Sequence, residues 1–481
     1  MFASYFGNCI TLTRVITEDE SSAFDIFDAL NTTGEPLTAL ETLRPRVIKF
    51  ERDYKGYKGS DSESAFKEIG DNLEEICKGK GPSKKPMETK EMIVTFALYI
   101  TGDKLAKDLA QQRLYLRNQF REATSSNRDK RLYVGGFLTS LKKVSTFRRF
   151  YWNVSELKNI GSYHGNDIVE SVKLQMRFLI AMGNSLALPI LARYWSSELD
   201  RDNDVQFENV LRALVAFVVL RRAATGSTAG IDSDLRGVMS GFTSGDARKL
   251  CRGIKEENEL ISVSELRVLF KDRLERKLQT FDKSSWVDKV CANPLYRQSR
   301  ELVRFMVFAA AHNAKPSKKS PGLWDRSSHV PSVDHANLLT FNTWEDDRYG
   351  TVEHVAPSRY SDEWPMELYT DEILRHSLGN LILLPKLENS ILGASNWDKK
   401  KQLYLALAES DVGQLKKIIA QAEQSGFSFP VRLREKLEKG NRLSILDSMR
   451  DVDEWDLDLV VRRGKNIAEL CWDVVRPWLD D

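Results

Sequence analysis

The sequence contains little cysteine for its length. It has five cysteines in 481 residues, far apart and with no CxxC pair: Cys9, Cys77, Cys251, Cys291 and Cys471. Zinc ribbons and disulfide frameworks need closely spaced or paired cysteines, so this pattern argues against both. We therefore expect a protein of a reducing environment, and predict a cytoplasmic location.

Long apolar runs are also absent. The longest, Ala213–Leu220, is much shorter than the roughly 20 apolar residues that a helix needs to cross a bilayer. No N-terminal stretch combines a basic start, an apolar core and a small-residue cleavage site. The sequence thus predicts neither a membrane span nor a secretion signal.

The chain as a whole has no large excess of either charge, because its formal net charge is +2. Locally the balance differs, because residues 113–152 hold ten Lys or Arg against two acidic residues. Seven aromatics lie among them: Tyr115, Phe120, Tyr133, Phe147, Phe150, Tyr151 and Trp152. Basic residues such as Arg148 and Arg149 are candidates for DNA phosphates, with aromatic faces stacking on bases. The alternative is a solvated helix face with the aromatics in the core, and both interpretations remain open at this point.

The composition that is present suits a folded protein. Hydrophobic residues make up 42% and charged residues 29%, and the length favours two or three domains. Residues 9–17 alternate like a short strand, residues 17–30 show helical spacing, and residues 31–34 predict a turn. From there to about residue 312 the apolar spacing predicts helices near 38–54, 62–78, 88–122, 132–148, 167–198, 205–224, 261–280 and 298–312.

Residues 313–350 change character, because Pro, Ser, Lys and Asp dominate there, as in a linker or surface loop. Five of the six histidines fall between His312 and His376. Strand-like segments follow at Tyr349–Val355 and Asn380–Leu384, and then helices to the end. The predicted fold is mainly α, with a short β-containing island where chemistry is expected.

The island holds an acidic residue directly before a histidine, Glu353-His354, at the end of the first strand. Successive strand residues face opposite ways, so Glu353 can ligate a hard divalent cation while His354 takes a proton from water. Asn380, on the second strand, can hydrogen-bond the loop or the histidine and fix its tautomer. Asn389 follows nine residues later, where a helix would supply an oxygen ligand. The set predicts a ββα-metal site.

The expected chemistry is hydrolysis of a phosphodiester. A metal held by Glu353 and Asn389 would polarise a phosphate oxygen and stabilise the leaving oxygen. Carboxylate and amide oxygens suit Mg²⁺ or Mn²⁺ better than zinc. Lys399, Lys400 and Lys401 follow on the next helix, and we predict that Lys399 and Lys400 contact phosphate.

A second acidic-histidine pair, Asp334-His335, lies nineteen residues upstream. It shows how readily such dipeptides occur by chance. Because it lies in a polar loop and not at the end of an apolar strand, we rank it as structural or supporting.

The ordered set from Val352 to Tyr404 resembles the C-terminal HNH (His-Me finger) domain of GmrSD-type modification-dependent restriction endonucleases. It is also similar to the matching domain of phosphorothioate-sensing SspE nickases. The shared pattern is Glu-His-x-x-Pro, Gly-Asn-Leu-x-Leu-Leu, Asn-Ser, and then Ser-Asn with a Lys-rich helix, over residues 349–404. The resemblance implies that His354 is the general base, Glu353 and Asn389 are metal ligands, and Asn380 is the orienting residue.

The N-terminal part resembles the same family. Residues 23–38 look like the IFxxLNxxGxxL helix-turn of its ParB-like NTPase domain, and Arg221-Arg222 is similar to that domain's helical extension. The alternatives are turn chemistry and a charge pair at a helix C-terminus. The family's nucleotide-hydrolysing Asp-Gly-Gln-Gln-Arg motif is missing upstream, and Gln111-Gln112-Arg113 lacks the Asp-Gly. We therefore do not expect this chain alone to hydrolyse a nucleotide, and we name no cofactor-binding residues.

These observations give five predicted regions. They are a C-terminal remnant of a ParB-like NTPase-family domain (1–60), a helical domain (61–312), a linker (313–348), an HNH nuclease core (349–410) and a C-terminal helical extension (411–481). The isolated strand at residues 9–17 needs partners to satisfy its backbone. We expect these from a separate chain supplying the NTPase half, or from a homodimer.

The leading hypothesis is a metal-dependent endonuclease subunit that cleaves or nicks DNA in bacterial antiphage defence, with modified phage DNA as its expected substrate. The defence role and the modified substrate are implied by the resemblance only. The alternatives are a non-catalytic DNA-binding or regulatory subunit and a toxin-like nuclease acting on RNA.

Overall fold

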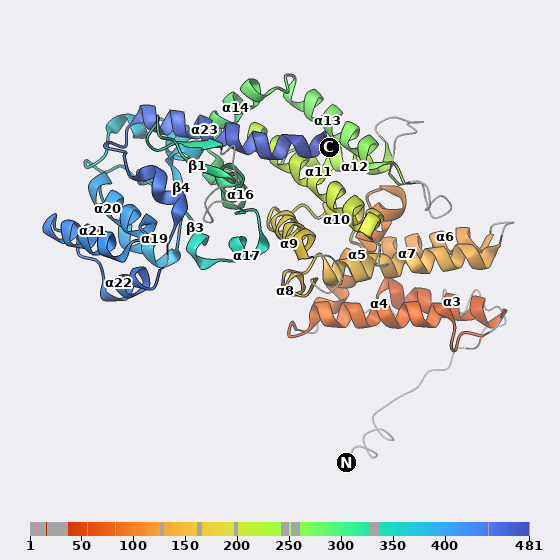
Figure 1. The fold of residues 1–481 in the computed structure, drawn as a ribbon. Coiled ribbons are helices and arrows are strands. Elements are labelled where there is room, and N and C mark those ends of the chain that lie inside the picture. The colour runs from red at the N-terminus through yellow and green to blue at the C-terminus, as the bar shows by residue number, and fades with distance from the viewer. Residues whose placement is uncertain are drawn as a thin grey trace, which may run out of the picture. The chain divides into compact units, whose positions relative to one another are not determined.

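The computed structural model describes residue 16 and residues 37–54, 56–81, 83–125, 129–160, 166–196, 201–241, 250–251, 260–326, 337–440 and 442–480. The predicted strand at 9–17 and the helix-turn at 23–36 fall outside the described residues, apart from Ile16. So does the Asp334-His335 pair. The described chain is mainly helical, as predicted, with few short strands (Figure 1).

The chain divides into two compact units, residues 1–96 with 104–145, and residues 97–103 with 146–481. The five predicted regions are a finer division and stay a prediction. No helix in the described parts of the chain has the length and apolar content needed to cross a bilayer.

The first unit is built from helices that pack through aromatic side chains. They are α3 (Ala39–Arg52), α4 (Asp61–Cys77), α5 (Lys84–Thr101), α6 (Leu109–Ser125) and α7 (Lys130–Phe150), and the unit boundary falls within α5 and α7. A capping box of Thr38 and Glu41 starts α3. Phe120 contacts Phe50 and Phe137 edge to face, which fills the core between α3, α6 and α7.

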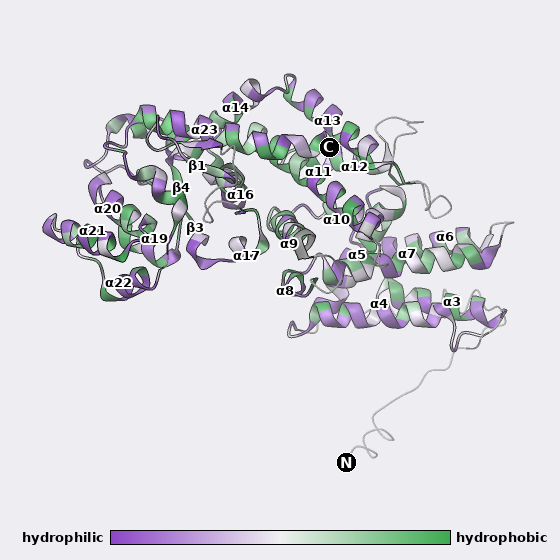
Figure 2. Cartoon of the chain, viewed as in Figure 1, coloured by the Kyte–Doolittle hydropathy of each residue, from purple (hydrophilic) through white to green (hydrophobic). Residues whose placement is uncertain are grey.

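The helical part of the second unit surrounds α11. Its helices are α8 (Val154–Leu157), α9 (Asn166–Ala181), α10 (Ala187–Tyr194), α11 (Arg201–Thr225), α12 (Ile231–Ser240), α13 (Val263–Leu278), α14 (Lys283–Cys291), α15 (Leu295–Gln298) and α16 (Arg300–Ala311). The apolar run Ala213–Leu220 is fully buried within α11. Figure 2 shows hydrophobic and hydrophilic residues alternating along most helices, as expected where one face is buried.

The paired arginines of α11 are structural. Arg221 is 1% exposed and its Nε lies 2.8 Å from Oδ2 of Asp234 on α12. Arg222 donates from Nη1 to the main-chain oxygen of Met182 at 3.1 Å. The two arginines therefore bind neighbouring segments to the C-terminal end of α11. This agrees with the alternative interpretation as a charge pair at a helix C-terminus, and both side chains lie in the core.

Two predicted helices are each broken into two. The segment predicted at 88–122 divides into α5 and α6, because Gly102 adopts a φ of +76° that ends α5. The segment predicted at 167–198 divides into α9 and α10, with Gly183 at a φ of +70° between them. Helices α12 and α14 were not predicted.

The segment predicted as a linker contains ordered pieces. Strand β1 (Ala314–Pro316) pairs antiparallel with β2 (Trp324–Arg326), followed by α17 (Phe341–Trp344) and η3 (Asp347–Tyr349). Ala314 and Trp324 are buried, and Trp324 exchanges main-chain hydrogen bonds with the Asn466 side chain. The polar composition of this segment therefore does not indicate the hairpin of β1 and β2, which Asn466 binds to the C-terminal helix.

The remaining elements form the β-containing island and its surroundings. They are β3 (Thr351–His354), η4 (Met366–Tyr369), α18 (Glu372–Arg375), η5 (Leu378–Asn380), β4 (Leu381–Leu384), α19 (Lys386–Leu392), α20 (Trp397–Ala408), α21 (Val412–Gln424), α22 (Val431–Glu438), η6 (Ser444–Met449), α23 (Leu457–Val475) and η7 (Arg476–Leu479). The long α23 packs along α14 and α16 (Figure 1).

Candidate functional site

Strands β3 and β4 form an antiparallel pair, as predicted from the two strand-like segments. Glu353 lies opposite Ile382, and His354 opposite Leu381. The exposure alternates along β3, with Val352 and His354 buried and Thr351 and Glu353 half-buried. The carboxylate and the imidazole therefore face opposite ways.

Glu353 is held by side chains from the two helices that follow β4. A hydrogen bond from Asn389 on α19 and the ammonium of Lys400 on α20 both favour its carboxylate form. Lys400 Nζ lies 3.3 Å from Glu353 Oε1. Burial outweighs these contacts and raises the pKa of Glu353 above its ordinary value. Asn389 Nδ2 also donates to Thr351 Oγ1 at 3.1 Å, which ties α19 to β3.

Lys400 is placed differently from the prediction. Its side chain is 0% exposed, and Nζ donates to the main-chain oxygen of His354 at 2.9 Å as well as to Glu353. Burial lowers the pKa of Lys400. It shares a buried helical stripe with Trp397 and Tyr404, a spacing visible in the sequence. Lys400 therefore organises β3 and does not offer its ammonium to a phosphate in solvent, whereas the half-buried Lys399 keeps that role as a prediction.

His354 contacts a second histidine that the sequence did not single out. His354 Nε2 lies 2.9 Å from His376 Nδ1, and the Tyr296 ring meets the His354 ring edge to face at 4.2 Å. Burial, followed by the charges of His376 and Lys400, lowers the pKa of His354 to about 3. His376 in turn accepts a hydrogen bond from Arg297 Nε at 3.2 Å. The clustering of histidines in this stretch was its only sequence signal.

Asn380 organises the loop after β3. It lies at the end of η5, directly before β4, and is 1% exposed. Its amide brackets Ala356, accepting from the main-chain N at 2.8 Å and donating to the O at 2.9 Å. It also donates to the oxygen of Arg375 and accepts from Trp455 Nε1. Two roles were predicted for Asn380, and these hydrogen bonds match the one in which it binds the loop. The residue that contacts the His354 ring nitrogen is His376.

The C-terminal helix α23 fixes the turn before β4. Arg463, buried to 1%, donates from Nη1 to the main-chain oxygens of Gly379 at 2.8 Å and Leu381 at 2.7 Å. A Cβ at Gly379 would lie 1.8 Å from the oxygen of Val460, so only glycine allows this approach. The predicted C-terminal extension is thus part of the support of the site.

Glu353 and His354 both reach a cavity of about 860 Å³, which we call the His354 cavity. Glu353 is the one carboxylate among its described lining residues, and three arginines reach it as well. Arg297 pairs with Glu372, while Arg300 and Arg359 make no ion pair with a described residue. The lining is Tyr296, Arg297, Gln298, Ser299, Arg300, Glu353, His354, Pro357, Ser358, Arg359, His376, Asn389, Ser390, Gly393 and Ala394.

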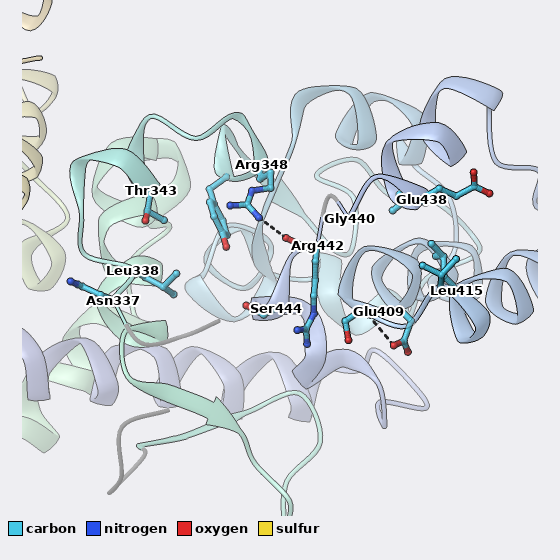
Figure 3. A pocket seen from close by; sticks show the side chains of 14 residues that line it. Asn337, Leu338, Thr343, Arg348, Glu409, Leu415, Glu438, Gly440, Arg442 and Ser444 are labelled. Atoms are coloured by element: carbon cyan, nitrogen blue, oxygen red, sulfur yellow. Dashed lines mark hydrogen bonds between the residues drawn. The ribbon is translucent and has the colours of Figure 1, made fainter. Parts of the chain in front are cut away.

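A second cavity of about 520 Å³, the Arg442 cavity, lies among η3, α21, α22 and η6. Figure 3 shows Arg348 reaching the main chain of Arg442, where Nη1 donates to the oxygen at 3.1 Å. Arg348 is also bonded to Asp346, and Arg442 to the Ala408 oxygen and Asp447. Both guanidinium groups are engaged within the protein.

The predicted DNA contacts at Arg148 and Arg149 lie in the last turn of α7, both half-buried. The guanidinium of Arg149 lies 4.6 Å from the centre of the Phe150 ring. Of the interleaved aromatics, Phe120, Phe147 and Tyr151 are buried, so they pack in the core and cannot stack on bases. The phosphate role of the two arginines stays a prediction.

The described residues contain no group of three or more His, Cys, Asp or Glu placed to hold a metal ion. A metal at this site would depend on the Glu353 carboxylate and the Asn389 amide. The two side chains are in contact, and the desolvated carboxylate is one that an added cation would stabilise.

Residues 255–470 match the family model described as GmrSD restriction endonucleases, C-terminal domain. The matched region contains β3, β4, α19, α20 and every lining residue of the His354 cavity. This supports the GmrSD-type resemblance for that part of the chain. The ParB-like resemblance of the N-terminal part has no such match. No curated protein matches the chain.

Proposed function

We propose that this chain is a metal-dependent HNH endonuclease that cleaves or nicks DNA. The observation that carries the proposal is the placement of Glu353 and His354 on opposite faces of β3, at a cavity lined by arginines. The match to a restriction-endonuclease domain over the same residues supports it.

In this proposal the two faces of β3 divide the work. His354 accepts the proton of the attacking water, because its imidazole reaches the cavity and a neutral ring can act as a base. Tyr296 and His376 hold the ring in place from two sides. Asn380 keeps the loop after β3 in position, so that the histidine and the cavity stay aligned.

Glu353 and Asn389 would hold the metal, Mg²⁺ or Mn²⁺. Both offer hard oxygen atoms, and Mg²⁺ usually takes few protein ligands and completes its shell with water and phosphate oxygens. When bound, the ion would stabilise negative charge on the phosphate and on the leaving oxygen. Lys400 favours the ionised form of the carboxylate and fixes its position, since its buried ammonium contacts both Glu353 and the backbone of His354.

The arginines of the His354 cavity suit a polyanionic substrate. Arg300 and Arg359 have no carboxylate partner among the described residues, so their charge is available to phosphate. This would place the backbone of the nucleic acid against α16 and the loop after β3. RNA carries the same phosphates, and an RNA-cleaving nuclease is therefore the second candidate.

The decisive experiment compares cleavage of plasmid DNA, modified phage DNA and RNA, each with Mg²⁺ and with EDTA. Cleavage of DNA that needs the metal supports the proposal, and preference for modified phage DNA would support the antiphage role. Cleavage of RNA alone would move the chain to the second candidate. Binding of DNA without cleavage under any metal would indicate the non-catalytic DNA-binding or regulatory subunit.

We also propose a separate partner chain that completes the N-terminal region, with a homodimer as the alternative. The support is the lone strand-like segment at residues 9–17 together with the family resemblance. Co-purification from native cells followed by mass spectrometry tests it. A monomer that is fully active alone and indifferent to nucleotide would contradict it.

A further inference from the structure

The two histidines of the site belong to a chain of four side chains joined by one ion pair and two hydrogen bonds. Glu372 pairs with the guanidinium of Arg297, Arg297 Nε contacts His376 Nε2 at 3.2 Å, and His376 Nδ1 contacts His354 Nε2 at 2.9 Å. The chain runs from the rim of the cavity to the proposed general base.

The direction of each hydrogen bond follows from the donors available. Arginine has only donors, so His376 Nε2 must accept and carries no proton. A neutral His376 then bears its proton on Nδ1 and donates it to His354 Nε2. His354 accepts at Nε2, and a neutral His354 bears its own proton on Nδ1. Both rings are therefore in the Nδ1–H tautomer in this arrangement.

A general base needs a ring nitrogen with a free lone pair. In this arrangement the Nε2 lone pair of His354 is used by His376 and its Nδ1 is protonated. The ring can accept a proton from water only if Nδ1 is bare, which requires that Nε2 carry the proton and donate it to His376. His376 would then be protonated at Nε2, where Arg297 Nε now lies.

We propose that Arg297 holds the His376–His354 pair in a resting tautomer, and that a phosphate of the nucleic acid releases the pair by drawing Arg297 away. The inference rests on the proposed function for its meaning, because it concerns the base of that reaction. In it Arg297 and His376 are positioning residues, since they act through His354.

The release balances in protons. When Arg297 leaves, His376 Nε2 takes a proton from water, and the shared proton shifts from His376 Nδ1 to His354 Nε2. The Nδ1 proton of His354 passes to water in the same exchange. No net charge is gained, both rings stay neutral, and His354 Nδ1 is left with its lone pair.

Phosphate is the ligand class that fits this release. The side chain of Arg297 is 60% exposed, lines the cavity and shares it with Arg300 and Arg359. A guanidinium can bind a phosphate through two parallel N–H donors, which competes with its contacts to Glu372 and His376. The His376–His354 pair would thus be freed where a phosphate is already bound.

The test reads the tautomers directly. Protein labelled with ¹⁵N only at histidine gives NMR signals that distinguish protonated from bare ring nitrogens, and His354→Ala and His376→Ala assign the two rings. In the free protein we expect both rings to be protonated at Nδ1. In EDTA, which prevents metal-dependent cleavage, a short DNA duplex should move the proton to Nε2 in both rings.

The matched variants are Arg297→Met and Arg300→Met. Arg297→Met keeps an unbranched side chain that ends near the position of Arg297 Nε and carries no donor, so the free protein should already show Nε2–H rings. Arg300→Met removes a neighbouring arginine that does not touch His376, and its free protein should keep the Nδ1–H rings. Rings protonated at Nε2 in the free unaltered protein, or unchanged tautomers in Arg297→Met, would overturn the proposal.

These readouts separate this inference from the proposed function. The tautomers of the free protein are measured without any cleavage, so they can be confirmed even if no nuclease activity is found. In the converse case, cleavage depends on His354 but the tautomers do not change in Arg297→Met. That result would support the proposed nuclease and contradict the release by phosphate.

Discussion

Two cavities of the second unit, the Arg442 cavity and the His354 cavity, both contain arginine, yet these arginines have different partners. In the Arg442 cavity each guanidinium is bonded to carboxylates or main-chain oxygens, so its charge is used by the fold. In the His354 cavity Arg300 and Arg359 have no carboxylate partner among the described residues. The comparison teaches that the presence of an arginine in a cavity does not by itself indicate an anion site. An arginine becomes a candidate for binding an anion when it has no carboxylate partner within the protein.

The same contrast extends to the acidic residues. Glu353 is largely buried, and its desolvation is only partly offset by Lys400 and Asn389, so its pKa is raised. Glu409 in the Arg442 cavity is stabilised as a carboxylate by main-chain N–H groups and by Arg450, so its pKa is lowered. Functional sites often keep such a raised carboxylate, whereas structural ion pairs lower the pKa of theirs.

The largest effect is expected for His354→Ala. Loss of the general base should reduce cleavage by about 10²- to 10⁴-fold while DNA binding and folding stay nearly unchanged. Cleavage rates with saturating DNA, together with fluorescence anisotropy for binding, measure both. His335→Ala is the control, because Asp334-His335 is a second acidic residue followed by histidine. Normal cleavage by His354→Ala, or its loss in His335→Ala, would show that the wrong strand was chosen.

The metal ligands come next. Glu353→Ala and Asn389→Ala each remove one oxygen ligand, so the Mg²⁺ or Mn²⁺ concentration for half-maximal cleavage should rise roughly 10- to 100-fold. Titration of each metal against a fixed amount of DNA measures the shift. Ser390→Ala, beside Asn389 but with its hydroxyl bonded to the Leu387 oxygen, is the control and should keep the metal requirement. Cleavage that persists in EDTA would contradict the scheme.

The cavity arginines should show a smaller effect of a different kind. Arg300→Ala and Arg359→Ala should each raise KM about tenfold with little change in kcat, because they bind phosphate without taking part in the chemical step. Each should also reduce the slope of log affinity against log salt by about one. If kcat falls and KM stays constant, these arginines act in the transition state and not in substrate binding.

The Arg442 cavity should respond in stability and not in cleavage. Arg442→Met leaves the Asp447 carboxylate without one of its partners and the Ala408 oxygen without its donor, so the free energy of unfolding should fall by roughly 1–3 kcal/mol. KM for DNA should be unchanged below the unfolding temperature. Thermal unfolding and steady-state cleavage of the same preparation measure both. A raised KM would mean that the two cavities share a substrate.

The sequence predicted the local part of this site better than its long-range part. Glu353, His354, Asn380 and Asn389 lie in one continuous stretch whose strand and helix periodicity can be counted, and β3 and β4 formed as expected. Arg297 lies 79 residues before His376, so no spacing could connect them. Lys400 was misplaced because a lysine triplet indicates exposure, although the stripe from Trp397 to Tyr404 already placed it on the buried face.

The fold shows the same division. Helices with a regular apolar face were predicted, whereas their breaks at Gly102 and Gly183 depend on single residues with positive φ. The composition of residues 313–348 predicts a linker, whereas the hairpin of β1 and β2 is bound by Asn466, about 140 residues later in the chain. Composition alone could not reveal that contact.

The smallest expected effect concerns the pH dependence of stability in the Arg442 cavity. The folded pKa of Glu409 is lowered, so the folded protein binds its proton less readily than the unfolded chain. Its contribution is present above the ordinary glutamate pKa and is lost as pH falls through the lowered value. Glu409→Gln should therefore reduce the unfolding temperature slightly at pH 7, and the difference from the unaltered protein should close as the pH falls below the lowered pKa of Glu409. Because its ion-pair partner Arg450 is exposed to solvent, the effect should stay below about 1 kcal/mol.

Glu438→Gln is the matched control for that measurement, since Glu438 lines the same cavity, is exposed and makes no ion pair with a described residue. Its unfolding temperature should follow that of the unaltered protein at every pH. A gap for Glu409→Gln that stays constant from pH 7 to pH 3 would mean that the side chain acts through packing and not through its charge. The Arg442 cavity would then lose the electrostatic role that sets it apart from the His354 cavity, and its arginines would have to be tested as ligand-binding groups in their own right.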